Sequence, residues 1–319
     1  MPFTKFTSHD IAVKSAVLDD NVFIHCMIGG EGPPLLLLHG YPQTHFMWHM
    51  IADDLASKFT VVAADLRGYG DSSKPRGSEN HIEYSKKEMA ADQVGLMQTI
   101  GFSEFFIVAH DRGARVAHRL AVDYPSTVKK MMLLDICPTL MMYETTDVKF
   151  AAGYWHWFFN IIPFPHPENI IMSNPQAYWD GLTSRATYSS VVHTPQAIDK
   201  YQSAFFNSET VHATCEDYRA SASIDLDHDR ADLINNHKIS IPALRVLWGT
   251  KGMIAKYDDI VAEWRKVCHN DLVEVTGRSM ECGHFIAEES SEELLQEIFE
   301  FLSVINDDGN DDRAGAIIS

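Results

Sequence analysis

Short apolar runs alternate along the chain with amphipathic stretches. The apolar runs cover residues 22–26, 34–38, 59–64, 105–109, 131–134 and 244–248. Nearly continuous apolar runs of this length are typical of parallel strands buried on both faces, so we predict a strand at each. Between them, residues 45–58, 85–100, 112–122, 257–268 and 288–304 have the apolar spacing of helices. The alternation predicts an α/β fold, with a mostly parallel central sheet flanked by helices.

The alternation stops in the middle of the chain. Residues 138–224 are rich in aromatic residues, methionine and proline, and they contain helix-like stretches without a clear strand. We therefore predict a helical cap over 138–224, inserted into a core formed by 1–137 and 225–305. Residues 306–319 hold four aspartates and two glycines. Such a segment buries too little surface to offset its ordering entropy, so we predict a flexible acidic tail.

Composition and charge narrow the class of partner. With 45% hydrophobic and 22% charged residues the chain is globular, and its formal net charge of −18 provides no basic surface for nucleic acid or an anionic membrane. No apolar run approaches the roughly 18 residues of a membrane span, and the N-terminus lacks a signal-peptide stretch. The five cysteines include no CxxC pair. We expect a cytoplasmic protein with reduced thiols, which acts on a small molecule without a metal or other cofactor.

A polar segment follows the fourth apolar run directly. Residues 109–113 read Ala-His-Asp-Arg-Gly, so small residues stand two positions to either side of Asp111. A sharp strand-to-helix turn requires such neighbours if its central side chain is to project above the sheet. Ligands of open α/β sheets bind beyond the carboxyl ends of the strands. Asp111 is therefore a candidate nucleophile, and the plainer alternative is that it only caps the following helix.

This segment resembles the nucleophile elbow of the α/β-hydrolase fold, with Asp in place of Ser. Two other motifs are similar to the same family. Leu-His-Gly-Tyr-Pro at 38–42 looks like the loop whose backbone N–H groups form an oxyanion hole, which implies that role for the N–H groups of Tyr41 and Arg112. Asp-Leu-Arg-Gly-Tyr-Gly-Asp-Ser at 65–72 looks like a stretch that shapes the site, and we assign it a scaffolding role.

A base and an orienting acid complete the predicted triad. His284 stands in a Cys-Gly-His-Phe context just before the last predicted helix, in the chain order that this fold uses. Asp135 follows the apolar run 131–134 and is the predicted acid that holds His284 in the correct tautomer. Asp258 and Asp259 are the weaker alternative, because they stand at the start of a predicted helix and can cap it.

An Asp nucleophile changes the reaction class. A carboxylate displaces a leaving group from sp³ carbon and forms an ester that water cleaves. Within this family that implies dehalogenation or epoxide opening. The stretches 153–159 and 215–220, together with two arginines after the elbow, closely resemble fluoroacetate dehalogenases, in which a cap His-Trp pair and a Tyr hold the halide. The resemblance assigns halide binding to His156, Trp157 and Tyr218, and the plainer alternative is that such aromatic residues form the core of the cap.

Arg112 and Arg115 stand three residues apart on the helix after the elbow, so they share one face. Two guanidinium groups suit a substrate with a carboxylate, and they favour the charged form of Asp111. The plainer alternative is a surface pair with salt-bridge partners. The resemblance covers 22–304 and implies hydrolysis of haloacetates, with fluoroacetate as the preferred substrate. An epoxide hydrolase and a non-catalytic binding protein of the same fold are the alternatives, and the oligomeric state stays open, with a homodimer as one option.

Overall fold

The computed structural model describes residues 2–183, 193–269 and 272–303, in which eight strands form one sheet in the order β1-β2-β4-β3-β5-β6-β7-β8. The strands are β1 (Phe6–Lys14), β2 (Asn21–Gly29), β3 (Pro34–Leu38), β4 (Thr60–Ala64), β5 (Phe105–His110), β6 (Val128–Leu134), β7 (Ala243–Gly249) and β8 (Glu274–Met280). The pairs β1–β2 and β2–β4 are antiparallel, and all the others are parallel. The predicted α/β class with a mostly parallel sheet is confirmed.

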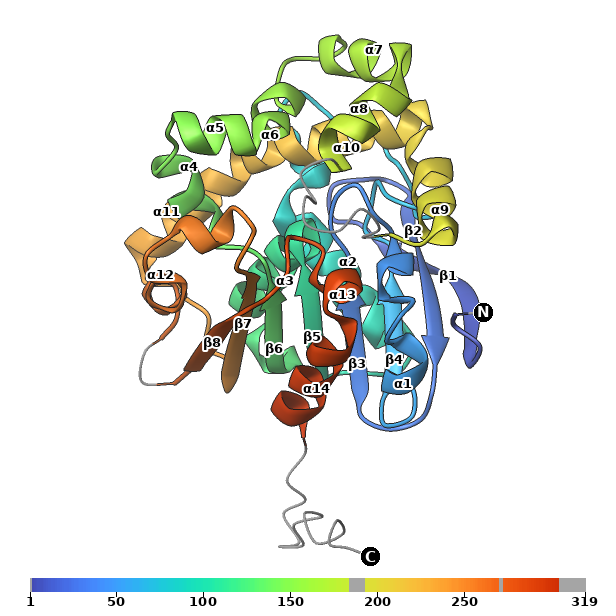
Figure 1. Ribbon diagram of the computed structural model, residues 1–319, viewed down its shortest axis with the longest axis vertical. Coiled ribbons are helices and arrows are strands. Elements are labelled where there is room, and N and C mark those ends of the chain that lie inside the picture. The colour runs from blue at the N-terminus through green and yellow to red at the C-terminus, as the bar shows by residue number, and fades with distance from the viewer. Residues whose placement is uncertain (1, 184–192, 270–271, 304–319) are drawn as a thin grey trace, which may run out of the picture.

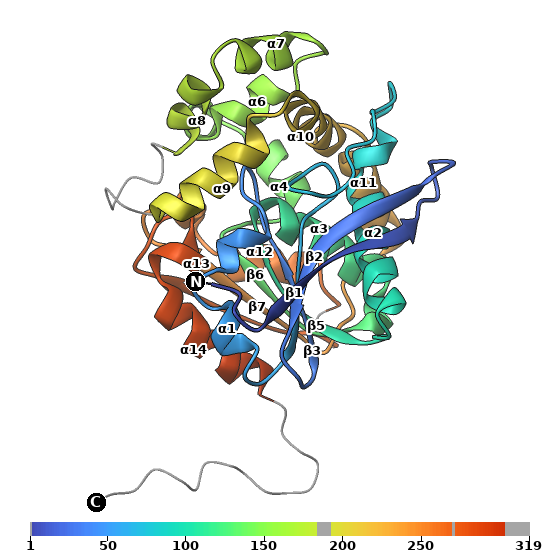
Figure 2. The same cartoon turned by 90° about the vertical axis from the view of Figure 1, so that its right-hand side faces the viewer.

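Helices cover both faces of the sheet (Figures 1 and 2). The helices of the core are α1 (Ala52–Leu55), α2 (Lys86–Thr99), α3 (Asp111–Asp123), α12 (Ile260–Lys266), α13 (Ile286–Glu289) and α14 (Ser291–Leu302). In Figure 2, α1 and α14 lie on one side of the strands, and α2 and α3 lie on the other. The inner strands are buried on both faces; Leu35 to Leu38 of β3, for example, have no exposed surface. This burial explains their continuous apolar sequence.

Two strands and three helix boundaries differ from the sequence prediction. The strands β1 and β8 were not predicted, because they are the edge strands of the sheet and most of their side chains reach solvent. The predicted helix 45–58 is a 3₁₀ turn (His45–Trp48) followed by the short α1, and helix 257–268 is reduced to α12. The predicted helix 288–304 is divided into α13 and α14 at Ser290, whose backbone φ of −142° is not helical.

Between β6 and β7 the described residues form helices and loops, without a strand. These helices are α4 (Thr139–Glu144), α5 (Val148–Gly153), α6 (Trp155–Asn160), α7 (His166–Ser173), α8 (Pro175–Thr183), α9 (Pro195–Phe205), α10 (Ser208–Ser221) and α11 (Ile224–Asn235). Most of them lie over one end of the sheet (Figure 1). The cap boundaries at 138 and 224 stay a prediction, and the predicted tail at 306–319 lies outside the described residues. Within the described part of the chain, every helix is too short or too polar to cross a bilayer.

Candidate active site

Asp111 stands at a sharp turn between β5 and α3. Its φ of 46° lies in the left-handed region, which non-glycine residues seldom adopt and which often marks a functional turn. Two glycines make room for this turn. A Cβ atom on Gly113 would lie 2.3 Å from the carbonyl oxygen of His39, and one on Gly40 would lie 2.5 Å from the Cβ of Asp111. The elbow therefore depends on close approach at both glycines, of which the elbow motif in the sequence includes Gly113.

His284 links the two predicted acidic residues. Its Nδ1 lies 2.6 Å from Oδ2 of Asp135, and its Nε2 lies 3.8 Å from Oδ2 of Asp111. A hydrogen bond between Nδ1 and Asp135 selects the tautomer whose Nε2 can accept a proton. The base thus faces the nucleophile without a direct hydrogen bond to it. The two side chains are close enough for one water molecule to be activated beside an ester on Asp111.

Asp135 is itself held in a fixed orientation at the end of β6. Its second oxygen, Oδ1, accepts a 3.0 Å hydrogen bond from the backbone N–H of Gly249, which ends β7. The weaker alternative acid, Asp259, instead accepts a hydrogen bond from the N–H of Ala262 and caps α12. The geometry therefore brings Asp135, and not Asp259, to the candidate base.

The two backbone N–H groups that were predicted to form the oxyanion hole differ in their hydrogen bonding to Asp111. The backbone N–H of Tyr41 donates a 3.0 Å hydrogen bond to Oδ1 of Asp111, so it is already directed at the carboxyl group. Among the described residues the N–H of Arg112 makes no hydrogen bond to that carboxylate. Its assignment to the oxyanion hole stays a prediction.

His110 has a structural role that the sequence analysis did not assign. Its buried Nε2 donates a 2.8 Å hydrogen bond to the backbone carbonyl of His284, which ties the elbow to the loop that carries the base. Burial and the neighbouring His284 ring lower the pKa of His110 to about 3, so this imidazole stays neutral. The only available signal was its place inside the elbow motif.

The electrostatic surroundings keep Asp111 charged. Burial by itself raises the pKa of this carboxyl, but His284, His110, Arg115 and Arg112 outweigh burial and lower the pKa below its usual value. A carboxylate nucleophile must be ionised to attack carbon. The surroundings of Asp111 therefore suit a nucleophile rather than a simple helix cap.

Arg112 is held by a residue of the cap that the sequence analysis did not single out. Asp217, on α10, accepts hydrogen bonds from Nε and Nη2 of Arg112 at 2.8 and 2.7 Å. Asp217 also pairs with Lys86 and accepts a hydrogen bond from the hydroxyl of Tyr69. The Nη1 of Arg112 is buried and has no hydrogen-bond partner within residues 2–183, 193–269 and 272–303. One side of the guanidinium is thus fixed, and the other is available to a ligand.

Arg115 is held more loosely. Its Nη1 donates a 2.8 Å hydrogen bond to the hydroxyl of Thr139, its Nε is buried without a partner, and no carboxylate pairs with it among the described residues. Burial and the neighbouring Arg112 lower its pKa from the usual value. A buried guanidinium without a counter-ion is costly, and an anionic ligand would supply the missing charge.

The three predicted halide residues lie together in the cap. His156 and Trp157 are on α6, and Tyr218 is on α10. The rings of His156 and Tyr218 have centres 5.5 Å apart, and those of Trp157 and Tyr218 have centres 6.4 Å apart. Both arginines lie against the aromatic rings, with Arg112 4.2 Å from the centre of Tyr218 and Arg115 4.7 Å from that of Trp157. The predicted halide and carboxylate groups are therefore neighbours.

Around Asp111 and the predicted halide residues, five buried donors have no hydrogen-bond partner in the part of the chain that the structure describes. They are Nη1 of Arg112, Nε of Arg115, Nε1 of Trp157 and the hydroxyls of Tyr218 and Tyr143. The sequence analysis missed Tyr143, whose ring centre lies 5.1 Å from that of Trp157. Buried polar groups in native proteins nearly always have partners, so a cluster of unpaired donors indicates a site for an anion.

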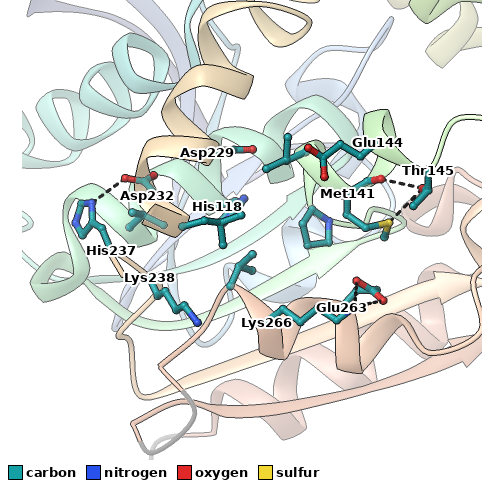
Figure 3. Close-up of a pocket in the computed structure, with 15 residues that line it drawn as sticks. His118, Met141, Glu144, Thr145, Asp229, Asp232, His237, Lys238, Glu263 and Lys266 are labelled. Atoms are coloured by element: carbon teal, nitrogen blue, oxygen red, sulfur yellow. Dashed lines mark hydrogen bonds and ion pairs between the residues drawn. The ribbon is translucent and has the colours of Figure 1, made fainter. Parts of the chain in front are cut away.

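A cavity of about 460 Å³ leads to the nucleophile. Asp111, His284, Tyr41 and His156 line it, and so do two lysines, Lys251 and Lys256. A second cavity, of about 290 Å³, lies between α3, α4, α11 and α12 and contains none of the predicted site residues (Figure 3). The reactive groups therefore open into the first cavity.

Comparisons with known proteins show the family of this chain. The alpha/beta hydrolase fold family matches residues 33–291. The chain is 39% identical over 284 residues to fluoroacetate dehalogenase from Burkholderia sp, covering 89% of this chain and 91% of that protein. It is 29% identical to soluble epoxide hydrolase from Corynebacterium sp. (strain C12), covering 88% of this chain and 93% of that protein. A solved structure from Nostoc sp PCC 7120, provisionally described as an alpha/beta hydrolase, has 50% identity and a TM-score of 0.87, covering 94% of this chain and 99% of that one. The chain belongs to the α/β-hydrolase fold family and, within it, to the family of fluoroacetate dehalogenase.

Proposed function

We propose that this enzyme hydrolyses haloacetates, and that fluoroacetate, converted to glycolate and fluoride, is its preferred substrate. The observation that carries the proposal is the cluster of unpaired buried donors beside a charged Asp111. The 39% identity to fluoroacetate dehalogenase supports the same reaction. The substrate has a carboxylate and releases a halide, so it presents two anionic groups to these donors.

The first step makes an ester on Asp111. One oxygen of Asp111 attacks the halogen-bearing carbon, the new C–O bond forms as the carbon–halogen bond breaks, and the halide leaves with the bonding electrons. Arg112 and Arg115 hold the substrate carboxylate through Nη1 and Nε. His156, Trp157 and Tyr218 donate hydrogen bonds to the departing halide. Fluoride is small and strongly hydrated, so its release requires several donors in a site from which water is excluded.

The second step cleaves the ester. His284 removes a proton from a water molecule, whose oxygen attacks the carboxyl carbon of Asp111. The N–H of Tyr41, which points at Oδ1 in the free enzyme, stabilises the negative charge that develops there. Collapse of the tetrahedral intermediate breaks the ester C–O bond, and the glycolate oxygen takes the proton held by His284. The second proton of the water is released to solvent as Asp111 returns to its carboxylate form. While His284 holds the proton, Asp135 stabilises its imidazolium form.

The entrance also favours an anion. Lys251 and Lys256 line the cavity of a chain whose formal net charge is −18. Global attraction of an anionic substrate is absent at this net charge, so local cations at the cavity are the means of drawing it in.

Epoxide hydrolysis is the second candidate. The unpaired hydroxyls of Tyr143 and Tyr218 favour it, since two cap tyrosines protonate the epoxide oxygen in enzymes of that type, and one relative is a soluble epoxide hydrolase. A neutral epoxide, however, gives the two arginines no anion to bind. The purified enzyme should be given fluoroacetate, chloroacetate and styrene oxide, with fluoride read by electrode and glycolate by chromatography. Turnover of styrene oxide without fluoride release would replace the proposal by this alternative, and failure with all three would favour a binding protein.

A further inference from the structure

Two histidines and one aspartate from three separate segments meet away from the catalytic groups. They are His25 on β2, His45 at the start of the 3₁₀ turn, and Asp65 directly after β4. One nitrogen of each imidazole and one carboxylate oxygen of Asp65 lie within 4.8 Å of one another. The proposed reaction uses none of these three side chains.

Each imidazole of this cluster is oriented by a carboxylate. Nδ1 of His25 lies 2.8 Å from Oδ1 of Asp10, and Nδ1 of His45 lies 2.9 Å from Oδ1 of Asp65. Within the described ranges, neither Nε2 has a hydrogen-bond partner. His25, with Nδ1 against the Asp10 carboxylate and a free Nε2, has the arrangement usual for metal-binding imidazoles. At His45 the carboxylate is Asp65 itself, so an ion shared by these two residues would replace the proton between Nδ1 and Oδ1.

The spacing of the two rings is compatible with a shared ion. Their centres lie 5.4 Å apart, at an angle of 45°. Because Zn–N bonds are about 2.0–2.1 Å long, two imidazoles on one zinc ion have ring centres roughly 5 Å apart. The cluster opens into a cavity of about 480 Å³, separate from the catalytic one, whose wall also includes Asp71 and one cation, Lys200. An ion can therefore reach the three groups from solvent.

We propose that His25, His45 and Asp65 bind one divalent transition-metal ion of the zinc class. Two imidazoles and a carboxylate suit zinc, cobalt or nickel, whereas calcium and magnesium prefer sites made entirely of oxygen ligands. A bound ion would connect β2, the end of β4 and the segment that follows Tyr41. It would therefore stabilise the fold behind the loop that supplies the Tyr41 N–H, without taking part in the reaction.

The test is a titration of the full chain with zinc and cobalt chlorides. Calorimetry should show one ion bound per chain, cobalt should develop visible absorption bands, and the thermal midpoint should rise with zinc concentration, since a ligand that binds only the folded state stabilises it. His25→Ala should weaken binding at least ~10-fold, and Asp10→Asn, which removes only the orienting carboxylate, about 10-fold. His237→Ala, on an exposed histidine that also pairs with an aspartate, is the matched control.

His25→Ala is the safer of the two histidine variants. Removing the His25 side chain affects only the exposed Asp10, whereas removing the His45 side chain would take an imidazole partner from the buried Asp65. Circular dichroism of His25→Ala should match the parent. The proposal is overturned if the parent binds neither ion, or if His25→Ala and His237→Ala bind zinc equally well.

Discussion

Two carboxyl groups near opposite ends of α3 show how surroundings decide the use of a buried acid. Asp111 begins α3 and faces the catalytic cavity, while Asp229, on α11, lines the second cavity beside His118 and Val122 of α3 (Figure 3). Burial raises the pKa of both. At Asp111 four nearby cationic or imidazole groups reverse the effect, whereas at Asp229 burial and the nearby Asp225 outweigh Arg119 and raise the pKa to about 7.

Burial by itself does not decide whether a carboxyl group is charged, as a nucleophilic carboxylate must be. Asp111 is buried and yet charged, because His284, His110, Arg115 and Arg112 together lower the pKa of its carboxyl group. Asp229 is half-buried, and its pKa is raised to about 7 because burial and the neighbouring acids Asp225 and Asp232 disfavour its charged form. Substitutions around Asp111 should therefore change activity, whereas substitution of Asp229 should change only stability.

His284→Asn should have the largest effect. By analogy with hydrolase triads, loss of the base can reduce turnover by up to about 10⁶-fold. The ester on Asp111 should then accumulate, because its formation does not require the base. Mass spectrometry of the digested variant after exposure to fluoroacetate should find the Asp111 peptide heavier by one carboxymethyl group. An unmodified peptide together with persisting turnover would remove Asp111 from the role of nucleophile.

Asp135→Asn should reduce turnover by as much as ~10⁴-fold, because the imidazolium form of His284 loses its stabilising carboxylate and the tautomer is no longer selected. Asp258→Asn is the matched control and should leave steady-state rates nearly unchanged. Equal losses in the two variants would contradict the assignment of Asp135.

Tyr218→Phe should reduce fluoride release by ~10²–10³-fold and chloride release by less, because fluoride is the poorer leaving group and depends most on each donor. The same variant should unfold at a slightly higher temperature, since it removes an unpaired buried hydroxyl, which costs about 1 kcal/mol or more. Tyr69→Phe is the control, because its hydroxyl is paired with Asp217 and its loss should lower the midpoint. Uniform losses on the two haloacetates would argue against a fluoride site.

Arg115→Lys should reduce kcat/KM for fluoroacetate by about 10- to 100-fold, the value of one or two charge-assisted hydrogen bonds. The charge is retained, but the ammonium cannot reproduce the planar fork of the guanidinium. Rates on fluoroacetate and on a neutral haloalkane would be measured for the parent enzyme and for the Arg115→Lys variant. A loss of the same size on the neutral substrate would show that Arg115 does not bind the carboxylate.

Asp229→Asn should leave activity unchanged and alter only the pH dependence of stability. A carboxyl whose pKa is raised in the folded state holds a proton that the unfolded chain has lost, so the folded state loses stability as pH rises from about 4 to about 7. The variant should therefore melt at a higher temperature than the parent at pH 8, with little difference at pH 4. Asp227→Asn, on an exposed neighbour, should show no such pH dependence. An identical change in midpoint at both pH values would contradict a raised pKa.

Local sequence patterns were enough to predict the fold class, which is confirmed, and to predict the residues of the candidate reaction centre. Apolar runs can be recognised locally, so the inner strands were predicted closely, and the elbow was recognisable because Ala109 and Gly113 flank Asp111 in the chain. The edge strands β1 and β8 were missed for the same physical reason, since a strand with one exposed face or edge carries no continuous apolar run.

How the candidate residues are held depends on contacts between segments that lie far apart in the sequence. Asp217 lies 105 positions from Arg112, and Asp135 lies 149 positions from His284, so neither contact has a local signal. Which donors remain unpaired, as in Arg112, Trp157 and Tyr218, depends on packing between the cap and the core. The charge state of Asp111 and of Asp229 likewise depends on groups from several segments. Pattern and spacing are properties of neighbouring residues, whereas burial, pairing and pKa are properties of the whole fold.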